Sequence, residues 1–234
     1  MKIYRSPWHI IATGLVLAAP FVFLLFFSKI IHIPASQLFG DVTISFWRLA
    51  AAYLISVIVA WALAVGFYTG RRADVALPFF DVLQSFPTSA ALPVATFYWG
   101  ASNFSVIFFL SIAIIWPILF SIISSLKLIK HDWEEAAEIM GLRGVNYLRY
   151  FLWPMSVPSL ITGSIIGLGD GWEALVATEI IIGVKGGLGR FFQFFANNPE
   201  ITIFGILGVL VIVFSINKLI WLPLLEWSHE KVSE

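Results

Sequence analysis

The chain has 234 residues, of which 59% are hydrophobic and 12% charged, whereas soluble domains are typically about 45–50% apolar and about 25% charged. This is too little polar material to cover a water-soluble fold of this size, and the chain is too apolar to be disordered. Because it has no cysteine, disulfides, thiolate metal sites and cysteine nucleophiles are excluded. The 14 basic residues balance the 14 acidic ones, so nothing suggests a nucleic-acid partner. We therefore expect an integral membrane protein, with residues 1–234 forming one transmembrane domain in a lipid bilayer.

Long uncharged segments predict an all-α fold. A spanning helix needs about 20 apolar residues, and the 45 uncharged residues of 82–126 are enough for two such helices. Turn-forming residues at 99–103 divide that segment. The segments do not alternate in polarity as the strands of a β-barrel do. Six transmembrane helices are predicted, at about 9–28, 44–69, 76–99, 104–126, 158–182 and 201–223.

The positive residues predict the orientation in the membrane, because cytoplasmic loops are enriched in Lys and Arg. With the N-terminus inside, three basic residues fall in external segments: Lys29, Lys185 and Arg190. Ten fall at or near the inner face: Lys2, Arg5, Arg71, Arg72, Lys127, Lys130, Arg143, Arg149, Lys218 and Lys231. Both termini are therefore expected in the cytoplasm. The polar stretch at about 127–158 then becomes a cytoplasmic loop, and that at about 183–200 an external one.

The cytoplasmic loop has the pattern of two short helices separated by a turn. Asp132 is a favourable N-cap, and Glu135 three residues later completes a capping-box pattern. Gly141 suits the end of this helix. A second helical segment is expected from about Val145, and it should end near Pro154.

This loop also carries a family resemblance. Glu135-Ala136-Ala137, then Gly141, then Phe151-Leu152-Trp153-Pro154 resembles the cytoplasmic loop of permease subunits of ATP-binding-cassette (ABC) importers. Aromatic residues replace the usual aliphatic ones at Phe151 and Trp153. In that family the loop, at about 127–157 here, docks on an ATPase subunit and transmits its closure. The resemblance implies coupling roles for Glu134, Glu135, Ala136, Ala137, Gly141 and Pro154. The alternative is a capped surface helix with no partner.

The resemblance extends over about residues 45–230. The stretch from Pro78 to Pro87, with Tyr98-Trp99-Gly100, is similar to the third-helix region of permeases for nitrate, sulfonates, taurine and bicarbonate. Gln84 stands where arginine is common in that group. Gly169-Asp170-Gly171-Trp172 and Ala177-Thr178-Glu179 resemble its fifth helix, and Gly187-Leu188-Gly189 its external turn. The acid at Asp170 is a departure from that group.

The resemblance implies a type I importer permease in the inner membrane of a prokaryote, moving a small anionic solute of that class by alternating access. The chain has no P-loop pattern. It is therefore expected to be a transport subunit and not an enzyme, to bind no cofactor, and to rely on two ATPase subunits that hold ATP and Mg. A second permease chain, identical or different, and an extracytoplasmic solute-binding protein are further implied partners. The alternatives are a stand-alone secondary transporter or channel and, less favoured, an intramembrane enzyme.

Ionisable residues within predicted spans are candidates for the translocation path or its gate. These are Arg48, Asp170, Glu173 and Glu179, together with the adjacent Trp172. Arg48 is expected either to extend to the outer surface or to attract an anionic solute. Glu179 can instead hold helices together through hydrogen bonds or an ion pair. Asp170 would repel an anion, so pairing with Arg48 or a place at a gate remains an open alternative.

Overall fold

The computed structural model describes residues 7–233, with side chains described for residues 12–228, and every regular element within this part is helical. The α-helices are α1 (Pro7–Ile31), α2 (Ala35–Phe67), α3 (Gly70–Gln84), α4 (Thr88–Trp99), α5 (Asn103–Leu126), α6 (His131–Ile139), α7 (Val145–Tyr147), α8 (Trp153–Ile182), α9 (Leu188–Phe194), α10 (Pro199–Ile216) and α11 (Leu222–Ser233). Two π-helical turns, η1 (Leu148–Leu152) and η2 (Asn217–Trp221), join neighbouring helices. The predicted all-α class is confirmed for these residues. Lys2 and Arg5, which entered the charge count, lie outside them.

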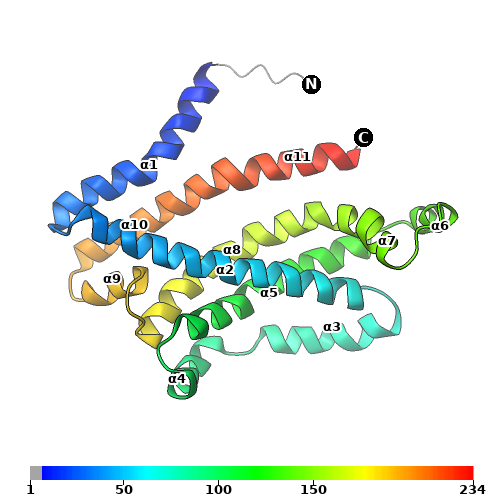
Figure 1. Cartoon of the computed structure of the whole chain (residues 1–234), viewed down its shortest axis with the longest axis horizontal. Coiled ribbons are helices and arrows are strands. Elements are labelled where there is room, and N and C mark those ends of the chain that lie inside the picture. The colour runs from blue at the N-terminus through cyan, green and yellow to red at the C-terminus, as the bar shows by residue number, and fades with distance from the viewer. Residues whose placement is uncertain (1–6, 234) are drawn as a thin grey trace.

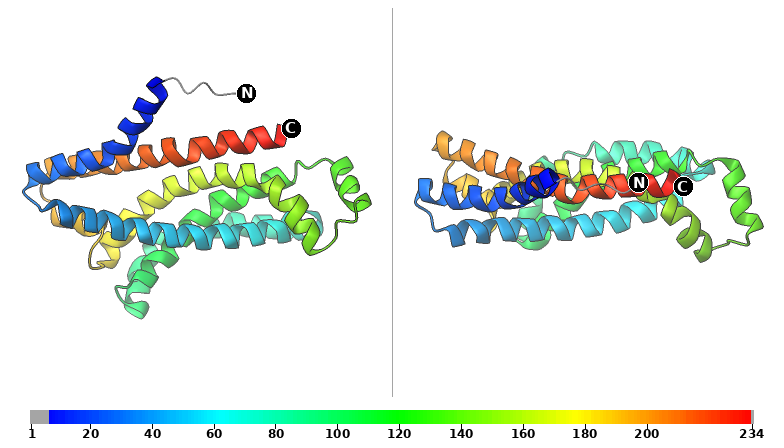
Figure 2. Two further views of the ribbon diagram at one scale, coloured as in Figure 1. Left: turned by 45° about the horizontal axis from the view of Figure 1, so that its top comes forward. Right: turned by 90° about the horizontal axis from the view of Figure 1, so that it is seen from above.

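The centre of the bundle is α5, which packs between α2 and α8 (Figure 1). Its inward residues, such as Leu110, Ile114 and Ile118, are fully buried. Close approach of α8 depends on Gly163, because a Cβ there would lie 2.8 Å from the Cα of Ile118. Figures 1 and 2 place α1 and α11 on one side of this core and α3 and α4 on the other. The three central helices therefore form the frame on which polar residues are positioned.

Among the residues that the structure describes, five helices are long and apolar enough to cross a membrane: Ala12–Ile31, Ala35–Phe67, Asn103–Leu126, Val145–Ile182 and Pro199–Ser228. The one predicted span that is not among these five, at 76–99, is divided into α3 and α4, of 15 and 12 residues. Pro87 explains this break, because a proline disfavours helical backbone in the residue before it and cannot donate a backbone hydrogen bond. Each of these two helices is shorter than a spanning helix of about 20 residues.

The segment expected to end near Pro154 instead continues without interruption. Residues Val145–Ile182 form one helical stretch of 38 residues through α7, η1 and α8. Pro154 occupies the first turn of α8, directly after the π-helical turn η1. Proline lacks the N–H group of a helix interior, and a local π turn accommodates that loss. The prediction of a helix end here was therefore wrong, and α8 is directly connected to the loop that contains α6.

Four of the connecting segments lie at two opposite ends of the molecule. The α2–α3 connection and the loop from α5 through α6 to α7 lie at one end (Figure 1). The α1–α2 connection and the segment from α8 through α9 to α10 lie at the other. Predicted inner-face residues such as Arg71, Lys130 and Arg143 are thus on segments at the first end, and Lys185 and Arg190 are on the segment at the second.

Candidate functional site: an exposed loop, a buried ion pair and a polar cavity

The loop helix α6 begins one residue before the expected cap. Its N-cap residue is Lys130, which makes no side-chain capping hydrogen bond, and Asp132 lies within the first turn. The predicted capping box is therefore not formed. His131 instead lies near both acids of the motif, with its Nε2 3.1 Å from Glu135 Oε1 and its Nδ1 3.8 Å from Glu134 Oε2.

The end of α6 is the tight turn that the sequence predicted. Gly141 has a φ of +76°, a conformation that residues with a Cβ rarely adopt. The amide of Leu142 donates to the Ala137 carbonyl at 3.0 Å and closes the turn. Ala137 is 3% exposed, so it packs inward, whereas Ala136 and Glu135 face outward. One alanine of the motif thus anchors the helix and the other lies on its open surface.

Large apolar side chains lie exposed around this turn. Ile139 is 87% exposed, Met140 79% and Val145 75%. Figure 1 shows that α6 projects beyond the ends of the neighbouring helices. At the base of the loop, Tyr147 lies close to Tyr68, the C-cap residue of α2. Burial raises the pKa of Tyr68 above its ordinary value.

A buried ion pair lies at the opposite end of the bundle. The guanidinium Nη1 of Arg48, on α2, contacts Oε1 of Glu179, on α8, and the two residues are 4% and 1% exposed. Arg48 also donates through Nε to Asn103 Oδ1 at 2.9 Å. Its Nη1 donates to the Gly186 carbonyl at 3.0 Å. Arg48 therefore does not extend to the outer surface, and its partner is Glu179 and not Asp170. Glu179 holds helices together, as one of the two alternatives expected.

The same acid fixes the glycine turn before α9. Glu179 accepts hydrogen bonds from Ser45 Oγ at 2.9 Å and from the Gly189 amide at 2.8 Å. The Gly187 amide donates to Asp41 Oδ1 at 2.9 Å. A Cβ on Gly189 would lie 2.3 Å from the Glu179 Cβ, so this position requires glycine. The motif Gly187-Leu188-Gly189 is thus the part of the predicted external segment that lies over the ion pair.

Two polar residues of this network were missed in the sequence. Asp41 and Ser45 are four residues apart, and Arg48 follows three residues later, so the three occupy one face of α2. That spacing was the available signal. Asp41 also accepts from Arg190 Nη2 at 3.1 Å, which ties the start of α2 to α9.

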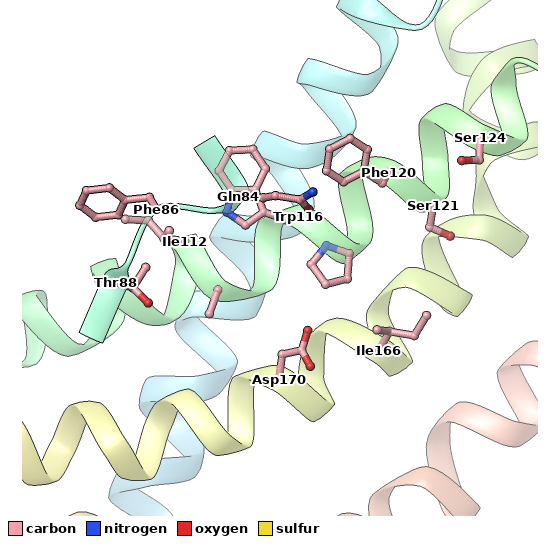
Figure 3. A pocket seen from close by; sticks show the side chains of 12 residues that line it. Gln84, Phe86, Thr88, Ile112, Trp116, Phe120, Ser121, Ser124, Ile166 and Asp170 are labelled. Carbon is pink, nitrogen blue, oxygen red and sulfur yellow. The ribbon is translucent and has the colours of Figure 1, made fainter. Parts of the chain in front are cut away.

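Asp170 lies elsewhere, at a cavity of about 640 Å³ between α8, α5 and the α3–α4 break. Figure 3 shows its carboxylate projecting from α8 toward the space beside α5. Gln84 and Thr88, which flank the break, and Ser121, on α5, also line this cavity. The broken helix therefore supplies polar residues to the same cavity as the acid of α8.

Glu173 and Trp172 line a second cavity, of about 800 Å³, beside α9 and α10. Trp172 is 6% exposed, whereas Glu173 is exposed. Asp170 and Glu173 are three residues apart on one helix, yet they border different cavities. Of the five candidate path residues, the structure thus brings Arg48 and Glu179 together, places Trp172 beside Glu173, and places Asp170 at the first cavity.

Residues 52–220 match the family described as the binding-protein-dependent transport system inner membrane component. This region includes α5, the α6 loop, α8 and α9, and thus the features described above apart from the first part of α2.

Individual relatives are nutrient permeases. The chain is 32% identical over 150 residues to the nitrate import permease protein NrtB of Leptolyngbya laminosa, covering 64% of this chain and 54% of that protein. It is 29% identical over 169 residues to the taurine transport system permease protein TauC of Escherichia coli, covering 68% and 60%. It is 26% identical over 155 residues to the bicarbonate transport system permease protein CmpB of Synechococcus elongatus, covering 66% and 56%. The chain thus spans little more than half the length of the curated relatives it matches.

Proposed function

Since the chain belongs to the family of inner membrane components of binding-protein-dependent transport systems, we propose that it is the permease subunit of an ABC importer. It pairs with a second permease chain, and two ATPase subunits bind ATP and Mg and dock on the cytoplasmic side. An extracytoplasmic solute-binding protein delivers the solute. The proposed location is the inner membrane of a prokaryote, with both termini in the cytoplasm.

The observation that carries this proposal is the exposed apolar surface around Gly141. Ile139, Met140 and Val145 are exposed on the loop that contains α6, at the end that bears Arg71, Lys130 and Arg143. Exposed apolar residues grouped on a projecting element are typical of a protein interface. Glu134 and Glu135 lie beside them and can accept hydrogen bonds from a partner. A relative from Methanocaldococcus jannaschii that is named a putative ABC transporter permease protein supports an ATPase as that partner.

The connection from α6 to α8 supports a mechanism of coupling. A displacement of α6 acts through the turn at Gly141 on the continuous helical stretch Val145–Ile182. At about 1.5 Å per residue this stretch extends roughly 57 Å, long enough to cross the hydrocarbon core. It carries Asp170 at the first cavity and Glu179 at the far end. Closure of the ATPase would thus move the wall of the cavity and change its access from one side to the other.

The first cavity is proposed to form the half of the translocation path that this chain contributes. Its wall includes the break between α3 and α4, and irregular backbone at membrane depth is tolerated where it lines a cavity. The two short helices together would provide the sixth crossing of a type I permease. The second chain would complete the path. The names of the relatives support a small solute of the nitrate, sulfonate, taurine or bicarbonate class.

Co-purification tests the docking surface directly. The full chain, tagged and expressed in its native host, should retain an ATPase subunit, and Met140→Asp should reduce that retention at least tenfold because a charge replaces an apolar contact. Phe194→Asp is the matched control, since Phe194 is 77% exposed and lies at the opposite end of the molecule. Absence of any ATPase subunit from the wild-type complex, or equal loss with both variants, would contradict the proposal.

A further inference from the structure

We infer that the first cavity selects solutes that carry an ammonium group, with Asp170 as the residue that sets this specificity. This rests on the proposed role of the cavity as part of the path, and it narrows the solute class. The residues that line the cavity include one ionisable side chain, Asp170, and no basic one. Asp170 is exposed to this cavity, and a carboxylate in a concave site attracts cations and repels anions.

Two arginines at the end that carries α9 are already paired with acids. Arg48 is engaged by Glu179, and Arg190 is paired with Asp41. Other basic side chains, such as Arg71 and Arg143, are on segments at the end that carries α6. The residues that line the cavity therefore contribute a net negative charge.

The neutral polar groups of the cavity also favour a hydrogen-bond donor as ligand. Gln84 donates one amide hydrogen to Asp81 Oδ1 at 2.8 Å, and its Oε1 can accept a hydrogen bond although its second amide hydrogen can still donate one. Ser121 donates its hydroxyl hydrogen to the Ser159 carbonyl at 2.7 Å, so its oxygen retains only acceptor capacity. Together with the Asp170 carboxylate, these groups present acceptors to the cavity. An ammonium group has three donors and no acceptor, and it matches such a set.

Aromatic side chains complete this arrangement. Trp116, Phe120 and Phe86 line the cavity from α5 and from the α3–α4 break (Figure 3). The face of an aromatic ring attracts a cation, most strongly in tryptophan. A nitrate or bicarbonate ion offers no comparable contact. An organic zwitterion with an ammonium group, by contrast, meets both the rings and the carboxylate.

The absence of cysteine in the sequence gives a test that does not require the natural solute. Ser121→Cys introduces a single thiol into the cavity of the full chain assembled with its partners. It is treated with two reagents of opposite charge, trimethylammonium-ethyl methanethiosulfonate and sulfonatoethyl methanethiosulfonate. The ratio of the two rates, divided by that ratio for a free thiol in water, measures the charge preference of the cavity. Any effect of Asp170 on thiol ionisation cancels in the ratio, because both reagents attack the same thiolate.

The ammonium reagent should be favoured by about tenfold or more, as expected for a cleft of one charge sign. Asp170→Asn in the Ser121→Cys chain should remove this preference. Glu173→Gln makes the same change of charge three residues along α8, at the other cavity, and should reduce the preference less than Asp170→Asn does. A preference for the sulfonate reagent, or an equal effect of the two substitutions, would overturn the inference.

A second pair of probes extends the test to solute binding. Taurine and ethanesulfonate differ only in the ammonium group, and only taurine should slow labelling of Ser121→Cys. Equal protection by taurine and ethanesulfonate, or protection by ethanesulfonate alone, would contradict the inference. A thiol that neither methanethiosulfonate labels before denaturation would also contradict it. None of these outcomes depends on retention of the ATPase subunit, so the proposed function is judged separately by co-purification.

Discussion

Replacement of Glu179 by glutamine should destabilise the protein strongly, because it leaves the Arg48 guanidinium buried without a counter-charge. The wild-type carboxylate accepts from Arg48, from Ser45 and from the Gly189 amide, and it is 1% exposed. A glutamine has a similar shape but only one oxygen. Its amide hydrogens would face groups that are already donors. The Glu179→Gln variant thus loses a charge and at least one hydrogen-bond acceptor at the same site.

Removal of one partner of a buried ion pair costs about 3–5 kcal/mol. For a chain of this size, about 1 kcal/mol changes Tm by roughly 2–4 °C, so the apparent Tm should fall by roughly 6–20 °C. Arg48→Met combined with Glu179→Gln should cost less than the sum of the two single substitutions, by about 1–3 kcal/mol. The reason is that no charge is left unpaired in the double variant.

The assay is the temperature dependence of tryptophan fluorescence, since the chain contains 10 tryptophans. All variants are compared in the same detergent and at the same heating rate. Glu173→Gln removes the same charge from an exposed position on the same helix, and its apparent Tm should stay within about 1–2 °C of the wild type. If Glu179→Gln also stays within that range, or if the double substitution is additive, the ion pair does not hold α2 against α8 as argued.

Two further predictions concern close helix contacts. Gly189→Ala should lower the apparent Tm by several degrees, because its Cβ would lie 2.3 Å from the Glu179 Cβ and 2.8 Å from the Ile180 amide nitrogen. Gly163→Ala should cost about 1–3 kcal/mol, since the added methyl group would press on the α5 backbone at Ile118 and overpack the contact. Gly169→Ala is the control for both, because nothing lies within 4 Å of its Cβ position. An apparent Tm that falls equally for all three variants, or for none, would refute this explanation.

The parts of the fold that follow from local sequence patterns were predictable. Long apolar segments placed α1, α2, α5, α8 and α10 approximately, because lipid requires spanning segments to satisfy their own backbone hydrogen bonds. Gly141 was recognisable as a helix end, since glycine readily adopts the positive φ found there. The division of 76–99 was not anticipated, although Pro87 lies at the break. Proline within an apolar segment can kink, end or begin a helix, and the surrounding packing decides which.

The same ambiguity explains the error at Pro154, where a π-helical turn preserves the helix. The observed N-cap of α6, Lys130, and the predicted one, Asp132, are two residues apart, and short-range patterns rarely resolve that difference. The pairing of Arg48 with Glu179 joins residues 131 positions apart. The sequence identified Arg48 and Glu179 as ionisable residues within predicted spans, but it did not show which opposite charge each of them contacts.

The central claim is that ATP binding at a partner changes access to the first cavity through α6 and Gly141. Its most direct test is the labelling rate of Ser121→Cys by the trimethylammonium reagent, added from one side of reconstituted vesicles, with and without ATP. In the complete transporter, with its ATPase subunits and binding protein, ATP should change this rate several-fold. Gly141→Pro should abolish the change, because proline fixes φ near −65° and cannot adopt the +76° of this turn. A labelling rate that is the same with and without ATP, or an ATP response that is unchanged in Gly141→Pro, would contradict the coupling proposed for this loop.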